Sequence, residues 1–281
     1  TKKYKKREEN VRSTVDRCYW PKAISKGVEL RTNSRVIKIT LDKSGKANGV
    51  IYLDINNKQN FQKASMVILA CSGVGTPRLL LNSANKYFSN GLANGSGLVG
   101  KNLMLHPLGY VEGKFNKFLG SFIGPEGCCI ASQEFYETLK DVKHKRGYTM
   151  QVLRGSGPFE TALLSRKFRS LQFGKNFHKQ FLRDYGHSIP IAIICEDLPE
   201  KHNSVELDHK NKDTGGMPGV KINYKLSENS KKMLAHGISK AKEVMKVVGA
   251  KSIKAFGPVR HTGWHLMGTT KMGKSKKNSV V

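Results

Sequence analysis

Acidic residues and long apolar runs are scarce in this chain of 281 residues. Asp and Glu number 21 against 49 Lys and Arg, which gives a formal charge of +28 at pH 7. The longest apolar runs, residues 66–70 and 189–195, fall far short of the ~18 residues that a membrane-spanning helix needs. We therefore expect a globular chain with no transmembrane segment, and its first residues lack the apolar stretch of a secretory signal.

Cysteines are also few, and they follow no metal-site or disulfide pattern. The five of them include no C-x-x-C pair and stand at Cys18, Cys71, Cys128, Cys129 and Cys195. This odd and scattered set argues against a disulfide framework or a zinc site, so we expect reduced thiols and no metal. Cys71 follows one apolar run and Cys195 ends another, and both are predicted to be small core residues.

The large positive charge is typical of proteins that bind nucleic acids or anionic surfaces. Such binding requires basic residues to cluster, whereas the lysines here are spread over the whole length of the chain. A general bias toward lysine gives the same pattern, so we do not expect nucleic acid as a partner. A non-catalytic basic protein that binds anionic polymers remains the alternative function.

The first clear structural signal is a run of short alternating segments. Residues 36–41 read as a strand, 42–46 as a turn and 49–55 as a second strand. After a further turn the chain returns through Phe61, so the pattern predicts a small antiparallel meander.

A strand, turn and helix are predicted next. Residues 66–70 are continuously apolar, which indicates a strand buried on both faces. Thr76 is suited to cap a helix over 76–81, and Pro77 is suited to its first position. The glycines of the turn between them let a ligand approach the backbone, and the turn is therefore the candidate cofactor site.

A second glycine pattern, Gly95-x-Gly97-x-x-Gly100, has the spacing of a dinucleotide-binding fingerprint. That fingerprint requires a preceding strand and a following helix. Turn-forming residues precede Gly95, and Pro107 stops any helix soon after it. These glycines are therefore predicted to serve tight turns.

Later segments predict a second sheet and a long helix. Residues 109–115 and 148–153 read as strands, and residues 204–208 and 220–224 as a further pair of strands. Ser227 is a plausible cap for an amphipathic helix that Gly249 ends. The apolar stripe of this helix is Leu234, Ile238, Ala241, Met245 and Val248.

The segment 263–273 concentrates His, Trp, Met and Gly without helix or strand periodicity. Within it, His265 carries an imidazole, the side chain most often used for proton transfer, and the flanking glycines admit a flat ligand. The residues alone leave open whether His265 is catalytic or an ordinary histidine.

Three segments resemble the glucose-methanol-choline (GMC) oxidoreductases, flavoenzymes that oxidise alcohols. They are "VILACSGVGTPRLLLNSA", "GLANGSGLVGKNLMLHP" and "HLMGTTKMG" with the "NSVV" that follows. They occur in the order typical of that family, and a weaker similarity runs through residues 203–250. Together they cover most of the chain.

This resemblance implies roles for particular residues and FAD as the cofactor. His265 matches the histidine that accepts the proton of the substrate hydroxyl while a hydride passes to flavin N5, and Trp264 would line the substrate pocket. His106 would either approach the cofactor or serve a structural role at a helix end. The implied cofactor-binding residues are Val36, Ala70, Cys71, Ser72 and Gly73.

The fold implied is α/β plus α+β. It comprises a partial FAD-binding, Rossmann-like domain with a β-meander (1–106), a substrate-binding domain with a mostly antiparallel sheet covered by helices (107–262), and a return segment with the catalytic histidine (263–281). The glycine turn that grips the FAD pyrophosphate in the family, and its last strand and helix, are not found here. We therefore expect an internal or C-terminal fragment that is inactive by itself.

The expected substrate is a small-molecule alcohol, with the electron acceptor left open. A further alternative is a substrate-domain subunit that needs a separate flavin-binding chain.

Overall fold

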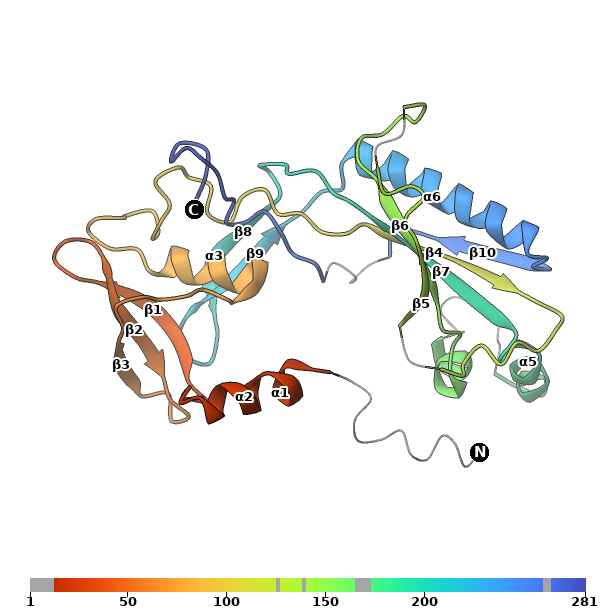
Figure 1. The fold of residues 1–281 in the computed structure, drawn as a ribbon, viewed down its shortest axis with the longest axis horizontal. Helices are drawn as coiled ribbons and strands as arrows, with labels where there is room; N and C mark the ends of the chain where they lie inside the picture. The colour runs from red at the N-terminus through yellow and green to blue at the C-terminus, as the bar shows by residue number, and fades with distance from the viewer. Residues whose placement is uncertain (1–12, 125–126, 138–139, 165–172, 260–263) are drawn as a thin grey trace. The chain divides into compact units, whose positions relative to one another are not determined.

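The computed structural model of the protein describes residues 13–124, 127–137, 140–164, 173–259 and 264–281. The chain divides into two compact units, Thr1–Val67 and Ile68–Val281, which we call the N-terminal and the C-terminal unit. Figure 1 labels their helices and strands. No helix of the described residues is long and apolar enough to cross a membrane.

The N-terminal unit contains the predicted meander. Its strands form an antiparallel sheet in the order β1-β2-β3, so the prediction is confirmed. Its elements are α1 (Val15–Cys18), α2 (Trp20–Ser25), β1 (Arg35–Leu41), β2 (Ala47–Leu53) and β3 (Gln59–Lys63).

Aspartates close both turns of the meander in the same way. One carboxylate oxygen of Asp42 accepts hydrogen bonds from the amides of Ser44 and Lys46, at 2.8 and 3.0 Å. One carboxylate oxygen of Asp54 likewise accepts hydrogen bonds from the amides two and four residues after it, at 2.9 and 3.0 Å. Such side-chain acceptors favour a turn over continued extension, which explains why the sequence folds back at these places.

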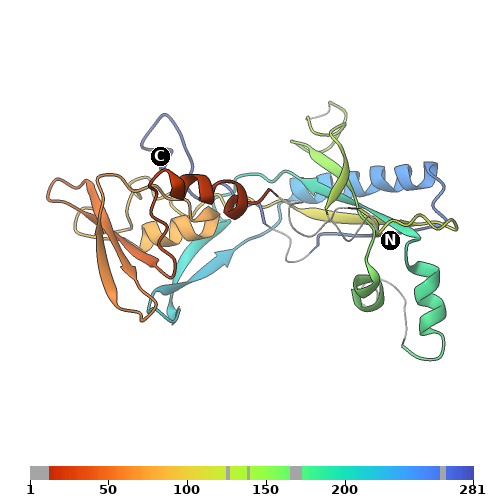
Figure 2. The same cartoon turned by 60° about the horizontal axis from the view of Figure 1, so that its bottom comes forward.

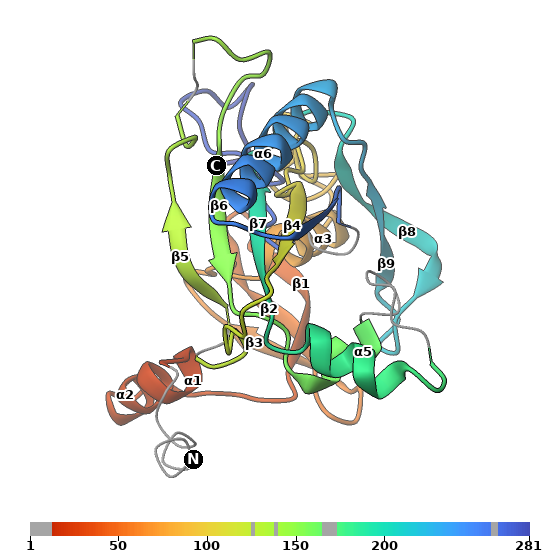
Figure 3. The same ribbon diagram turned by 90° about the vertical axis from the view of Figure 1, so that its right-hand side faces the viewer.

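The C-terminal unit is built around a five-stranded sheet in the order β10-β4-β7-β6-β5, in which all neighbours are antiparallel. Helix α6 (Glu228–Val247) lies along one face of this sheet (Figures 2 and 3). The strands are β4 (Leu108–Lys114), β5 (Cys128–Ser132), β6 (Tyr148–Leu153), β7 (Ser188–Cys195) and β10 (Ser252–Phe256). The unit also contains the π-helix η2 (Glu160–Leu164) and helix α5 (Phe177–Asp184).

Helix α6 begins as predicted, because the Ser227 hydroxyl accepts a hydrogen bond of 3.0 Å from the amide of Ser230. Its buried stripe packs on the sheet, where Gly237 allows a close approach: a Cβ there would lie 2.5 Å from Ile193. Val248 does not belong to this stripe. It follows the helix as its C-cap and is 57% exposed, whereas Met245 in the last helical turn is 2% exposed.

A separate hairpin joins β8 (Ser204–Lys212) and β9 (Pro218–Asn223), as the alternating patterns predict. Helix α3 (Ser72–Asn82) packs against it. Arg78 of α3 binds the hairpin loop through Asp213, at 2.8 Å, and through the carbonyl oxygen of Pro218. The hairpin is therefore fixed to α3 by a charge-assisted hydrogen bond as well as by packing.

Two predictions around residue 70 are wrong. Residues 66–70 form no strand, and Ile68 is 84% exposed, because no described strand pairs with this segment. An apolar run becomes a buried strand only where neighbours satisfy its backbone and cover its faces. For the same reason Cys71 is exposed, whereas Cys195 is fully buried as predicted.

Helix α3 also begins earlier than its signals predict. It starts at Ser72, so Thr76 is not its cap, and Pro77 lies inside the helix.

The chain has a mixed α/β architecture with antiparallel sheets. All strand pairs among the described residues are antiparallel, so they do not confirm the Rossmann-like part of the predicted fold class.

Candidate active site

The segment that contains His265 is held by backbone hydrogen bonds to residues 100–104. Met267 and Met104 exchange two of them, with N–O distances of 2.9 and 3.1 Å. The amide of Gly100 donates to the carbonyl oxygen of Thr269 at 2.8 Å. His265 therefore lies on a braced loop, whose course is fixed just after the imidazole.

A glycine permits this close contact. Gly268 has a φ of +89°, and a Cβ at this position would collide with the carbonyl oxygen of Asn102. Only glycine satisfies both the left-handed backbone and the lack of space.

The same loop touches the start of α3. A Cβ on Gly73 would lie 2.7 Å from the Cβ of Leu266, and the hydroxyl of Thr269 donates a hydrogen bond of 2.7 Å to the carbonyl oxygen of Gly73. The structure thus brings the turn predicted to bind the cofactor beside the loop predicted to be catalytic. Gly73 and Thr269 are 196 residues apart in sequence.

Several of the predicted site residues are open to solvent. Ala70, Cys71 and Ser72 are exposed at the start of α3, and Trp264 is 65% exposed beside an exposed His265. Ser72 has a φ of +63°, a strained conformation for a residue with a side chain. An exposed helix N-terminus presents backbone N–H groups and the positive end of the helix dipole, which favour an anionic group.

His106 lies against His265. The two ring centroids are 5.0 Å apart and the ring planes are nearly perpendicular, at 89°. The Nδ1 atom of His106 is 2.9 Å from the carbonyl oxygen of Cys195. Because a carbonyl can only accept, Nδ1 carries the hydrogen of this bond. His106 is thus fixed in orientation beside an exposed imidazole.

The helix-end alternative for His106 is wrong, because no helix lies in the described segment between α3 and β4. The nearby Cys195 is not a nucleophile either. Burial raises the pKa of its thiol to about 12, so the sulfur stays protonated near neutral pH.

Val36 lies on β1 of the N-terminal unit, with its side chain 36% exposed. Its contact with an adenine remains a prediction. Among the residues that the structure describes, no three His, Cys, Asp or Glu side chains group as a metal site requires.

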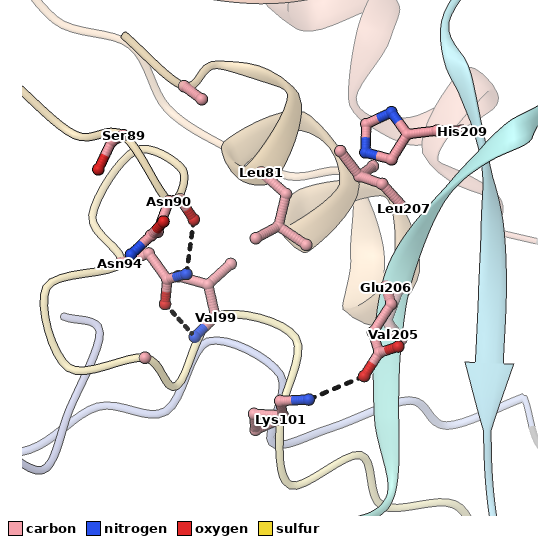
Figure 4. A pocket seen from close by; sticks show the side chains of 12 residues that line it. Leu81, Ser89, Asn90, Asn94, Val99, Lys101, Val205, Glu206, Leu207 and His209 are labelled. Atoms are coloured by element: carbon pink, nitrogen blue, oxygen red, sulfur yellow. Dashed lines mark hydrogen bonds and ion pairs between the residues drawn. The ribbon is translucent and has the colours of Figure 1, made fainter. Parts of the chain in front are cut away.

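The backbone amides of the Gly95 loop form the loop's own turns. The amide of Gly97 donates to the carbonyl of Asn94, and the amide of Val99 donates to the Asn94 side chain at 3.0 Å. The loop lines an open hollow of about 420 Å³, in which the Lys101 ammonium is paired with Glu206 at 2.8 Å (Figure 4). These amides are not available for a phosphate, in agreement with the predicted turn role.

Sequence reasoning missed Thr269, which no one-residue signal marks. Pro77 becomes a signal only once the structure places it inside α3. There it leaves a carbonyl without its usual donor, and Thr269 contacts that carbonyl.

Comparisons with known proteins match most of the chain. Family models of GMC oxidoreductase match residues 2–108 and 199–281. The chain is 37% identical over 272 residues to a 2-methyl-1,2-propanediol dehydrogenase of Mycolicibacterium austroafricanum, an alignment that covers 96% of this chain and 49% of that protein.

Two more distant relatives are 25% identical. They are the fructose dehydrogenase large subunit of Gluconobacter japonicus, matched over 92% of this chain and 47% of that protein, and the gluconate 2-dehydrogenase flavoprotein of Pantoea cypripedii, matched over 90% and 43%. The chain spans about half the length of these curated relatives.

These matches place the chain in the class of flavin-dependent oxidoreductases. It belongs to the GMC oxidoreductase family. The family and its flavoprotein relatives imply FAD as the cofactor.

Proposed function

We propose that this chain belongs to an enzyme that oxidises the CH–OH group of a small alcohol, with His265 as the acceptor of the hydroxyl proton. The observation that carries the proposal is the placement of His265, an exposed imidazole on a braced loop that touches the start of α3 through Leu266 and Gly73. The diol named for the relative at 37% identity supports a small aliphatic alcohol as the first substrate class to test.

The residues at the start of α3 fit FAD. Ala70, Cys71 and Ser72 are small and exposed, so a bulky ligand is able to approach the N-terminus of α3. The helix start suits the anionic part of such a ligand. We assign Gly73 to the same set of FAD-binding residues at the start of α3. We assign Val36 of the N-terminal unit to the binding of the adenine of FAD.

The bound FAD supplies the hydride acceptor, and the protein supplies orientation and proton transfer. The His265 imidazole accepts the hydroxyl proton, and the alkoxide character that results makes the carbon a better hydride donor. The neighbouring His106, held through Nδ1 by the Cys195 carbonyl, limits how far the His265 ring is able to swing. Trp264 packs against the substrate.

The domain organisation belongs to this proposal. Residues 1–106 form the flavin-binding part and residues 107–262 the substrate-binding part. The five-stranded sheet and α6, which lie wholly within 107–262, support this division. Residues 263–281 return to the flavin-binding part, and the hydrogen bond from Thr269 to Gly73 supports that placement.

The substitution His265→Ala, made in the full-length protein that contains this chain and loaded with FAD, tests the role of the imidazole. We expect flavin reduction by an excess of 2-methyl-1,2-propanediol to slow by about 10²- to 10⁴-fold, the usual contribution of a general base. The measurement is the loss of flavin absorbance without oxygen, together with the FAD content of each variant. FAD is expected to stay bound.

A histidine elsewhere provides the matched control. His209 is exposed on β8, and His209→Ala should leave the rate unchanged. If His265→Ala loses FAD, His265→Asn repeats the test with a polar side chain. Flavin reduction at the wild-type rate in a flavin-loaded His265 variant would refute the assigned role.

A further inference from the structure

A proline stands in the body of α3. Helical carbonyls normally accept a hydrogen bond from the amide four residues later. Pro77 lies four residues after Gly73 and has no N–H, so the carbonyl of Gly73 lacks this donor. The proline ring also crowds this carbonyl, which favours an outward tilt of the oxygen.

The hydroxyl of Thr269 takes the place of the missing donor. Its Oγ1 lies 2.7 Å from the Gly73 oxygen, and the threonine is only 1% exposed. The Thr269 carbonyl in turn accepts the Gly100 amide at 2.8 Å. Thr269 therefore contacts two separate segments, one through its side chain and one through its backbone.

This contact lies close to the proposed catalytic imidazole. Thr269 follows His265 by four residues, and the intervening Met267 is bonded twice to Met104. The backbone bonds fix the loop to residues 100–104. Among the described hydrogen bonds, the one from Thr269 to Gly73 is what links the loop to the start of α3.

We propose that Thr269 is a positioning residue for His265: its hydroxyl occupies the donor site left vacant by Pro77 and sets the loop against the start of α3. The inference rests on the proposed function, because it assigns to Thr269 the placement of the proton acceptor relative to the cofactor-binding turn. A small displacement of a catalytic group is enough to slow a reaction strongly.

A double-mutant cycle tests this pairing. Thr269→Val keeps the side-chain volume but removes the hydroxyl. Pro77→Ala restores an N–H that is able to reach the Gly73 carbonyl. The four proteins are the wild type, each single variant and the double variant, each made in the full-length protein and loaded with FAD, and Thr269→Ser serves as the conservative variant.

In the wild-type background, we expect Thr269→Val to slow flavin reduction at saturating alcohol about tenfold, with little change in KM. In the Pro77→Ala background the same substitution should cost less than about twofold, because the N–H of residue 77 already takes the Gly73 carbonyl and the threonine no longer holds the loop there. Thr269→Ser should stay near the wild-type rate. Pro77→Ala by itself should also slow flavin reduction, because it weakens the link between the loop and α3, whereas a purely structural role, in which the carbonyl only needs a donor, predicts the wild-type rate for that variant.

Equal slowing in both backgrounds would overturn the inference, as would a wild-type rate in Thr269→Val. If Thr269→Val does not fold, the double variant still decides: it should fold and reduce flavin at a rate close to that of Pro77→Ala, and failure to do so contradicts the pairing. The His265→Ala measurement separates the two proposals. If His265→Ala is slow while the double-mutant cycle shows no coupling, the proposed function stands and only the role of Thr269 is refuted.

Discussion

Gly268 leaves no room for a side chain next to the proposed catalytic loop. Its φ is +89°, and a Cβ would meet the Asn102 carbonyl oxygen. Gly97 makes a matched comparison, because its φ is also positive, at +68°, but nothing lies within 4 Å of its Cβ position. The two positions separate the cost of backbone strain from the cost of a steric clash.

We expect Gly97→Ala to lower the free energy of unfolding by about 1 kcal/mol, the cost of a left-handed alanine. Gly268→Ala should cost more than about 2 kcal/mol, because the loop must also move away from Asn102. Urea unfolding measures both. Equal costs for the two variants would show that the loop yields freely and is not braced as described.

Single residues also show how far sequence reasoning reaches. The motif around His265 predicts a site residue, but the sequence does not reveal that His106 lies against it or that the Cys195 carbonyl orients His106. Those contacts join positions 89 residues or more apart. Local patterns carry no information on such pairings, and only the fold brings them together.

At the scale of elements, a helix or a turn is predictable from the sequence where residues next to it in the chain stabilise it. The meander is predictable because its turns are closed by their own aspartates, and α6 is predictable because Ser227 caps it. Residues 66–70 and the start of α3 are not. A strand needs neighbours, and α3 tolerates an internal Pro77 with the help of a distant threonine.

The packing of α6 on β6 makes stability depend on pH. His236 of α6 lies 2.9 Å from the Tyr148 hydroxyl. Burial lowers the pKa of His236, and the neighbouring His144 and Lys240 lower it further, with Glu243 opposing. In the unfolded chain a histidine has a pKa of about 6.5. As the pH falls below that value, the unfolded state gains a proton that the folded state resists.

The free energy of unfolding should therefore fall as the pH is lowered from about 7 to about 5. His236→Gln keeps an acceptor for Tyr148 but cannot titrate, so its stability should fall less steeply over this range. His209→Gln, an exposed control on β8, should follow the wild type. Denaturant unfolding at several pH values measures the slopes, and equal slopes for His236→Gln and the wild type would contradict the assignment.

At the scale of the whole molecule, composition and family resemblance contribute different knowledge. The family resemblance identifies FAD, which no periodicity or spacing in the chain reveals. Composition, on the other hand, predicts that like charges repel one another in the folded protein. The formal charge of +28 comes from lysines and arginines in both units, so repulsion between like charges opposes compaction throughout.

This repulsion should make salt stabilising. Raising sodium chloride from about 0.01 to about 0.15 M shortens the screening length from roughly 30 to roughly 8 Å, which weakens repulsion between distant surface lysines. Several of the described ion pairs are exposed and offset little of this repulsion, such as the pair of Lys231 with Glu228, whose side chains are 52% and 76% exposed. We therefore expect the urea midpoint to rise with salt while the denaturant slope stays constant. A midpoint that falls with salt would mean that specific ion pairs outweigh the net charge, and the same series with potassium chloride checks that the effect belongs to ionic strength and not to one cation.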